Sequence, residues 1–402
     1  MMERSAIFRI ALLFNANKAY DRQIIEGVGE YIQASQALWD VFIADDYRSD
    51  IQRLEEWTFD GIIADMDDAS SEAYLGRLPV PVVGVGGSYH QSSSYPALPY
   101  VATDNYALVR SAFHHLVQKG LRYFALYSFP ESQNKRWALE RELAFEALLH
   151  EGDHQGKIYR GYDIDVNNWQ QAQNALMAWV KALPEGTGII AVTDSRARHL
   201  LQVCEYLEIP VPEKIAIIGI DNEELARYLS RISLSSVVQG CRQMGYQAAK
   251  LLHLQLRQMP LPAQQIIVPP ARVIARRSTD YLSVVDPCVI RAMHFIRNHA
   301  CKGIKTEQVL DHVGLSRTNL DTRFRQSLGQ SIHEMIHHQK LESARQLLIT
   351  TALSINEIAD VTGYRSLQYF HAVFKKAYAV TPLVYRSRWH STEENSDADH
   401  TL

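Results

Sequence analysis

The sequence predicts an α/β body of two lobes, each with a doubly wound parallel sheet, followed by an all-α domain with two helix-turn-helix motifs. Three observations support this fold class. The 402 residues exceed one ordinary core, so more than one domain is expected. From Phe8 to about Ala275, short apolar runs alternate with longer segments of helical periodicity, as in repeated βα units. After Asp286 no strand pattern remains, and one helix-turn-helix pattern occurs twice.

The strands are predicted from short apolar runs, which are typical of parallel sheets covered on both faces. They are Ile7–Phe14, Asp40–Ala44, Gly61–Ala64, Val80–Val85, Tyr123–Tyr127, Gly188–Val192 and Ile215–Ile220. Helices are predicted between them, for example at Asp21–Gln33 and Asn105–Gln118, where apolar residues recur at helical spacing. The two sets interleave as a doubly wound fold requires.

The βα units are too numerous for one sheet of usual size, and a second series begins near Leu121. We therefore expect lobe 1 to contain about residues 7–110 with 240–275, and lobe 2 about residues 111–239. The late helix Arg242–Leu256 and the strand-like Gln264–Val268 and Ala271–Ala275 would return to complete lobe 1. Such a return predicts a cleft between the lobes, outside the carboxyl ends of the strands, where open α/β sheets bind ligands.

Residues 1–275 are thus predicted to form a ligand-sensing domain, 276–286 a linker, 287–390 a helical domain and 391–402 a disordered tail. The net charge of −4 is unevenly distributed, because residues 286–390 carry 14 Lys and Arg against 8 Asp and Glu, leaving 27 against 37 elsewhere. A basic domain on an acidic body favours binding to a phosphate backbone, although a solvated basic face has the same composition.

Composition also argues against several classes of protein. No run approaches the ~20 apolar residues of a membrane span, and the N-terminus lacks a secretory signal, so we expect a cytoplasmic protein. The four cysteines are far apart and include no CxxC pair, which indicates reduced thiols rather than disulfides or a metal cluster. We predict no metal site, cofactor or catalytic residue.

Two segments carry the helix-turn-helix pattern. In residues 305–328, Val309 and Val313 precede a turn at Gly314, Ser316 can cap the next helix, and its inner face repeats at i, i+4 and i+8 as Leu320, Phe324 and Leu328. In residues 354–378 the same roles fall to Ile355, Ile358, Val361, Gly363, Ser366, Phe370, Phe374 and Tyr378. A helical stretch at Glu342–Leu348 lies between the two copies.

Residues 287–388 resemble the AraC-type DNA-binding domain, including the ending VFKKAYAVTPLVYR at 373–386. The resemblance implies two recognition helices that enter successive major grooves of double-stranded DNA. The chain departs from the family pattern at Thr322 and Ala372, where many relatives have arginine, and the base contacts there stay open.

The base-reading candidates are the exposed residues near the starts of the two helices: Arg317, Thr318, Asn319, Asp321, Thr322, Arg365, Leu367, Gln368, Tyr369 and His371. Arg suits guanine, and Asn or Gln suits adenine. The phosphate-binding candidates are Arg323, Arg325, Lys375, Lys376 and Arg386. For any one of these polar residues, a merely solvated helix face is the alternative.

Residues 14–28, 84–87, 100–109, 188–197 and 216–224 resemble the sugar-binding fold shared by periplasmic binding proteins and LacI-type repressors. In LacI-type proteins the DNA-binding helices come first, whereas here the helical domain follows. The combination resembles activators of pentose-use genes, which implies D-xylose or a related sugar as effector, a homodimer, and a contact with RNA polymerase.

Sugar binding requires planar polar groups that pair with adjacent hydroxyls, and aromatic rings against the C–H face. Seven residues are the candidates: Tyr20, Asp65, Arg136, Trp169, Asp194, Asp221 and Gln239. The resemblance places sugar contacts at Arg136, Asp194 and Asp221. A carboxylate at the end of a strand can instead cap the next helix, the role expected of Asp104, and Trp169 can be ordinary helix packing.

Two other functions are alternatives to a sugar-sensing regulator. An enzyme, such as a sugar kinase or isomerase fused to a DNA-binding module, is disfavoured because the sequence has no P-loop, no HExxH and no G-x-S-x-G, and GVGGS at 84–88 lacks dinucleotide-binding spacing. A regulator of the same architecture that senses another pentose, a hexose or a purine stays open, because the fold permits all of them.

Overall fold

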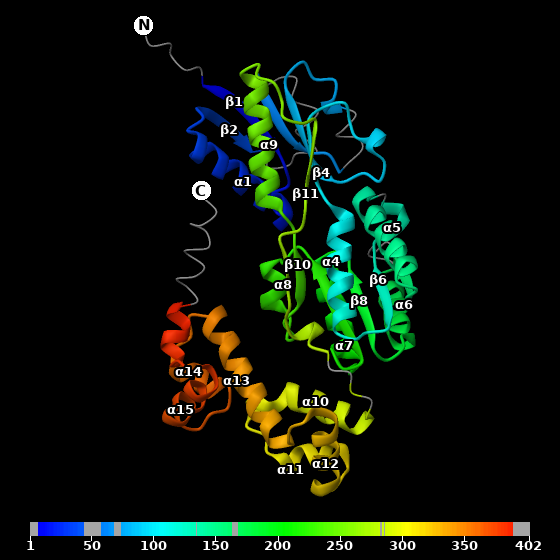
Figure 1. Cartoon of the computed structure of the whole chain (residues 1–402), viewed down its shortest axis with the longest axis vertical. Coiled ribbons are helices and arrows are strands. Elements are labelled where there is room, and N and C mark those ends of the chain that lie inside the picture. The colour runs from blue at the N-terminus through cyan, green and yellow to red at the C-terminus, as the bar shows by residue number, and fades with distance from the viewer. Residues whose placement is uncertain are drawn as a thin grey trace. The chain divides into compact units, whose positions relative to one another are not determined.

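The computed structural model describes residues 7–43, 58–67, 74–133, 135–162, 168–281, 284 and 286–388 (Figure 1). The chain divides into two compact units, Met1–Leu282 and Ser283–Leu402, here called the sensing unit and the helical unit. The sensing unit contains two six-stranded sheets and the helical unit contains only helices among its described residues, so the predicted fold class is confirmed. The predicted tail at 391–402 lies outside the described residues.

The first sheet has the strand order β11-β5-β4-β3-β1-β2, and its described pairings are parallel. Its strands are β1 (Phe8–Leu13), β2 (Trp39–Ile43), β3 (Gly61–Asp65), β4 (Val82–Gly87), β5 (Tyr100–Thr103) and β11 (Gln265–Val268). Strands β3, β4 and β5 are buried throughout, as parallel strands covered on both faces should be. Helices α1 (Ala19–Ser35) and α9 (Cys241–Leu256) pack against each other and bury their apolar faces on this sheet.

The second sheet has the order β12-β10-β9-β8-β6-β7. Its strands are β6 (Tyr123–Tyr127), β7 (Gln155–Tyr159), β8 (Thr187–Ala191), β9 (Ile215–Ile220), β10 (Ser235–Val238) and β12 (Arg272–Ile274). One apolar cluster joins this sheet to α4 (Asn105–Gln118) and α5 (Arg136–Glu151), and another joins it to α6 (Trp169–Ala182) and α7 (Asp194–Tyr206). The short helix α8 (Glu224–Leu229) and the 3-10 turn η4 (Arg277–Thr279) complete this half.

Two of the predicted lobe assignments are wrong. Strand β12, expected in lobe 1, pairs antiparallel with β10 in the second sheet, with Val273 opposite Val237. Helix α4 was divided between the lobes at residue 110, but it packs as a whole on the second sheet. Local apolar patterning predicts that a strand or helix exists, but it does not determine which sheet the element joins. The neighbouring strands β11 and β12 illustrate this, since only β11 pairs within the first sheet.

The helical unit consists of α10 (Pro287–His299), α11 (Thr306–Val313), α12 (Arg317–Leu328), α13 (Ile332–Thr350), α14 (Ile355–Val361) and α15 (Leu367–Tyr378), with the 3-10 turn η5 (Ala300–Lys302). It has two apolar clusters, one around Phe324 and one around Phe374. Gly314 and Gly363 both have φ of 75°, so each turn uses the left-handed conformation that glycine tolerates. Both predicted helix-turn-helix units are confirmed, although Val361 is 53% exposed and is not part of the buried stripe.

Of the three predicted caps, Asp104 and Ser366 are confirmed, and a further cap lies at Asp286. Asp286 caps α10 by accepting a hydrogen bond from Cys288 N, and Pro287 stands at the first helical position. Asp104 accepts from Ala107 N and Ser366 from Tyr369 N, as capping residues do. Ser316 stands at the N-cap of α12 without a side-chain capping bond. Across the described residues, no helix is long and apolar enough to cross a membrane.

Candidate functional site

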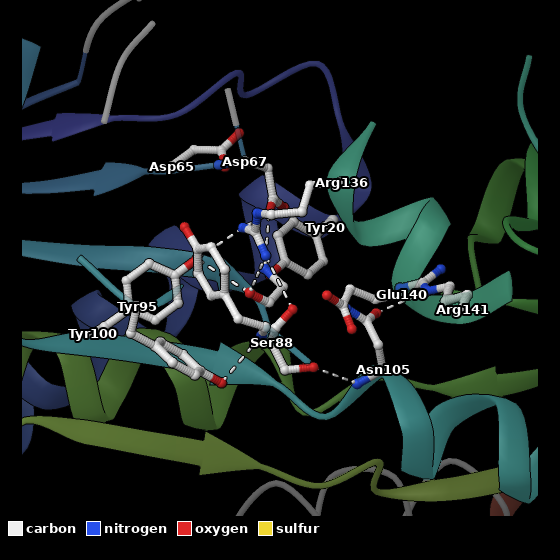
Figure 2. A network of polar contacts seen from close by, with 12 residues as sticks. Tyr20, Asp65, Asp67, Ser88, Tyr95, Tyr100, Asn105, Arg136, Glu140 and Arg141 are labelled. Atoms are coloured by element: carbon white, nitrogen blue, oxygen red, sulfur yellow. Dashed lines mark hydrogen bonds and ion pairs between the residues drawn. The ribbon is translucent and has the colours of Figure 1, made fainter. Parts of the chain in front are cut away.

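In the sensing unit, hydrogen bonds join the carboxyl ends of the two sheets. Thr103 is the last residue of β5 in the first sheet, and Gln239 follows β10 in the second. The Thr103 hydroxyl donates to Oε1 of Gln239 at 3.2 Å, and both side chains are buried. Charged and polar residues from both sheets surround this junction, and several of them are drawn in Figure 2.

Arg141 organises the part of the junction that comes from the second sheet. This arginine of α5 is buried, and its Nε donates to Oδ1 of Asn105 at 2.9 Å. Its Nη atoms donate to the carbonyl of Val192 and, at 3.4 Å, to Gln239. The Gln239 amide in turn donates to Oδ1 of Asp221. Asn105 Nδ2 is buried and has no partner among the described residues, which points to a ligand or water as its acceptor.

Burial raises the pKa of Asp221 to about 6, and Arg141 and the Gln239 hydrogen bond oppose this rise. The residue has a φ of 121°, a backbone conformation that side chains other than glycine rarely adopt. A strained backbone conformation persists where surrounding contacts enforce it, and such residues are common at ligand sites.

A second group of carboxylates follows the strands of the first sheet. Burial, together with Asp67 and Asp21, raises the pKa of Asp65 to about 8. The pKa of Asp21 rises to about 6, again chiefly through burial. Lys18 Nζ lies 3.9 Å from an oxygen of each of Asp21 and Asp65 and is their nearest described cation. Asp21 Oδ1 has no partner among the described residues.

Tyr20 lies beside these carboxylates, and burial with the nearby Asp67 raises the pKa of its phenol well above the usual value. Its hydroxyl donates to Met244 Sδ of α9 at 3.8 Å. This contact links α1 to α9, and Figure 2 shows the Tyr20 ring next to Arg136.

Asp194 and Trp169 differ from the other candidates. Both carboxylate oxygens of Asp194 already accept hydrogen bonds, from Ser236 Oγ at 2.7 Å and from Glu223 N at 2.8 Å. Burial and the nearby Asp221 raise its pKa to about 7. Trp169 begins α6 and is 54% exposed, and it makes none of the described contacts of the junction.

Asn105, Asp67 and Arg141 were not among the predicted site residues. A signal for Arg141 exists in α5, since the buried face of this helix includes Arg141 and Glu142 among alanines, Phe145 and Leu148. A charged pair within an apolar stripe indicates buried polar contacts. Asn105 could be found as the residue after the predicted cap Asp104, where the chain leaves the end of β5.

The helical unit presents the predicted DNA-reading residues on its surface. The residues of α12 and α15 and of the preceding turn that are exposed are Arg317, Thr318, Asn319, Thr322, Arg325, Arg365, Leu367, Gln368, Tyr369, Lys375 and Lys376. His371 is half-buried. These side chains lie on the face of each helix opposite Phe324 and Phe374, where they are available to a partner.

Three other candidates hold the unit together. Arg323 donates to Asp286 Oδ2 at 3.0 Å and so links α12 to the cap of α10. Asp321 accepts from the backbone of Ile332 at 3.3 Å, at the start of α13. Arg386 donates to the carbonyls of Leu348 and Leu353, at 3.2 and 2.6 Å, and fixes the chain between α13 and α14.

Models of known families match most of the chain. The family described as the XylR N-terminal domain matches residues 9–106, and a periplasmic binding protein-like domain matches residues 113–279. A helix-turn-helix domain matches residues 309–388. The matched segments follow the order of the two sheets and the helical unit.

Some relatives match this chain along nearly their whole length. The chain is 63% identical to the xylose operon regulatory protein of Escherichia coli (strain K12), over 94% of this chain and 96% of the relative. The protein of that name from Haemophilus influenzae is 50% identical over 94% of this chain and 98% of its own. A solved structure described as the xylose-binding transcription activator xylR superposes with a TM-score of 0.88 at 62% identity, covering 94% of this chain and 98% of the other. The chain therefore belongs to the family of xylose operon regulatory proteins, transcription regulators that join a periplasmic-binding-protein-like domain to a helix-turn-helix DNA-binding domain.

Proposed function

We propose that the protein is a transcriptional activator that binds D-xylose in the sensing unit and switches on genes for xylose transport and catabolism. The observation that carries the proposal is the junction of buried polar side chains from both sheets, where Asn105 Nδ2 and Asp21 Oδ1 have no described protein partner. Buried polar atoms are nearly always hydrogen-bonded, so a polar ligand would complete this site. The names of the relatives support xylose as that ligand.

In this proposal, hydroxyl groups of the sugar pair with charged and amide side chains. Asn105 donates from the start of α4, Arg141 donates from α5, and Asp221 accepts between them. Asp65 accepts from a hydroxyl on the side of the first sheet, and the Tyr20 ring covers the C–H face. Gln239 fixes Asp221 and Arg141 on the side of the second sheet and accepts from Thr103 of the first sheet, while Asp194 supports the loop at Glu223.

The helical unit is proposed to read promoter DNA through both recognition helices. Arg317, Asn319, Arg365 and Gln368 have the donor and acceptor groups that suit guanine and adenine. The exposed lysines at the end of α15 suit phosphates. Two equivalent units would contact two successive major grooves on one side of the duplex.

The wider assembly completes the proposal. We place the protein in the cytoplasm, as a homodimer whose four helix-turn-helix units bind repeated half-sites and whose bound form contacts RNA polymerase. It works by binding and not by catalysis, as a regulator of this family.

Calorimetric titration of the full-length protein tests the effector. D-xylose should bind, and Asp221→Asn should weaken binding by about 1.5–3 kcal/mol, because a hydrogen bond to a charged group is lost. The matched control is Asp153→Asn, which changes an exposed carboxylate of the sensing unit and should leave binding unchanged. Binding of another pentose, a hexose or a purine in place of D-xylose would reassign the effector. Binding that survives Asp221→Asn unchanged would refute the proposed site.

A further inference from the structure

Arg136 connects the two sheets of the sensing unit. It is the first residue of α5, which packs on the second sheet, yet its described polar contacts are with residues at the ends of strands in the first sheet. Figure 2 shows the guanidinium surrounded by them. The contacts are Nη1 to the carbonyls of Gly87 (2.9 Å) and Ser88 (3.0 Å), and Nη2 to Asp67 Oδ1 (2.8 Å) and the Tyr100 hydroxyl (3.2 Å).

These bonds use the donors of the guanidinium almost completely. The two terminal nitrogens of an arginine carry four N–H groups, and the four described acceptors match that number. The ring of Tyr89 covers one face of the guanidinium, with its centroid 3.7 Å from Cζ. Arg136 therefore has little left to offer a sugar hydroxyl, and its partners are protein groups of the opposite lobe.

A second contact lies one turn along the same helix. Glu140 Oε1 accepts a hydrogen bond from the backbone of His90 at 2.9 Å. Helix α5 is thus fixed to the segment after β4 at two points, once through a cation and once through a carboxylate.

The backbone is shaped for this close approach. A Cβ added at Gly87 would lie 2.9 Å from the Cβ of Trp137 and 2.8 Å from Asn105 Nδ2. Trp137 belongs to α5, so any side chain at position 87 would separate α5 from the end of β4. Glycine at this position permits the contact on which the Arg136 bonds depend.

The ion pair is favourable only when the lobes are together. The side chains of Arg136 and Asp67 are 23% and 17% exposed, so water screens the pair little and the attraction is stronger than at an open surface. If the lobes separated, both groups would return to water and the four hydrogen bonds would be lost together.

We propose that Arg136 is a clasp between the lobes, which sets the balance between the open and closed forms of the sensing unit and does not read the sugar. The inference rests on the proposed function, because the same lobes enclose the proposed sugar site. It changes the role expected for Arg136 from sugar donor to positioning residue.

A clasp has a distinctive effect on affinity. When only the closed form binds tightly, the apparent dissociation constant is the intrinsic one divided by the closed fraction. Loss of the clasp therefore weakens every ligand of the site by one common factor, of about tenfold for a typical conformational coupling. If a residue instead contacts one sugar hydroxyl, its loss should leave the affinity for the analogue that lacks this hydroxyl unchanged.

The test compares full-length Arg136→Gln with the wild-type chain in titrations of D-xylose and of xylose analogues that each lack one hydroxyl. The expected result is the same loss for every ligand, with Arg136→Lys restoring part of it. Arg110→Gln is the matched control, because Arg110 is an exposed arginine on α4, and it should change nothing. A loss that disappears for one analogue would overturn the proposal and return Arg136 to sugar reading.

A second measurement needs no sugar. Spectroscopic labels at the exposed positions Gln33 of α1 and Lys181 of α6 report the distance between the lobes. Arg136→Gln and Gly87→Ala should both increase the open population, the first by removing the ion pair and the second by a steric wedge that keeps every charge. Unchanged distances in both variants would refute the clasp. If the wild-type chain bound no sugar but opened in these variants, the proposed effector would fail and the clasp would stand.

Discussion

At the scale of single residues, the proposed sugar site contains buried carboxyl groups whose surroundings disfavour the ionised form. Burial is the largest cause in each case, and it raises the pKa of Asp65 to about 8, of Asp194 to about 7 and of Asp221 to about 6. In the unfolded chain these groups titrate near their ordinary value, about 3.9. At these groups the folded state therefore binds more protons than the unfolded state between about pH 4 and pH 8, so their contribution to stability falls as the pH rises through this range.

The pH profile of unfolding tests this directly. Between about pH 5 and pH 8, the melting temperature of Asp65→Asn relative to the wild-type chain should rise by a few degrees, because the substitution removes the carboxyl group with the highest folded pKa. Asn can still accept the backbone hydrogen bond that Asp67 N donates to this side chain. Asp153→Asn is the control and should leave the slope as it is. A melting-temperature difference between Asp65→Asn and the wild-type chain that stays constant from pH 5 to pH 8 would contradict the assignment.

Arg386 and Lys376 separate structure from DNA binding within the helical unit. Arg386→Ala should lower the unfolding free energy by about 1.5–3 kcal/mol, because a charged donor to two backbone carbonyls is lost. Lys376→Ala should keep the stability and instead reduce the salt dependence of DNA binding by about one phosphate contact. Denaturant titration and DNA binding at several salt concentrations measure the two effects. A stable Arg386→Ala protein with a reduced salt slope would show that Arg386 serves DNA after all.

At the scale of elements, the two helix-turn-helix units have a glycine at the equivalent position of the turn, but the two glycines have different surroundings. Gly314→Ala should lower the free energy of unfolding by about 1–2 kcal/mol, because alanine is strained at a φ of 75°. Backbone strain is the whole expected effect, since the added Cβ would meet nothing within 4 Å. Gly363→Ala should cost more, because its Cβ would also lie 2.7 Å from the carbonyl oxygen of Cys301. Denaturant titrations of both variants check the order. Equal losses of unfolding free energy in the two variants would mean that the backbone near Cys301 moves away from the added Cβ without a cost in free energy.

The sequence predicted those elements whose local pattern matches their environment. Strands such as β3 and β9 are apolar throughout because both faces are covered, and they were found. The edge strand β7 reads QGKIY, is half exposed and carries no such run, so it was missed. Strand β10 contains two buried serines whose partners lie far along the chain, Ser235 with Thr279 and Ser236 with Asp194, and no local pattern encodes these contacts.

The site was predictable where it depends on strand ends. Asp65 and Asp221 were predicted because carboxyl ends of parallel strands meet at one edge of a sheet, and the structure places both at such ends. Arg141 and Asn105 were missed because their role depends on the way α4 and α5 pack, which only the folded chain determines. Arg136 was found as a residue, and its contacts with the opposite lobe come from a tertiary approach that the sequence does not display.

At the scale of the whole molecule, the account requires that two separately folded units influence each other. A sugar that favours the closed sensing unit can change DNA binding only if the two forms present the helical unit differently. Thermodynamic linkage then makes the effect reciprocal, so DNA must raise the affinity for sugar by the factor by which sugar raises the affinity for DNA. Typical couplings of this kind are about 5- to 150-fold.

The most direct test measures promoter DNA binding by the full-length protein with and without saturating D-xylose, at one fixed salt concentration, and then D-xylose binding with and without saturating DNA. The account predicts that both affinities rise and that the two factors agree. Equal DNA affinity in the presence and absence of the sugar would contradict it.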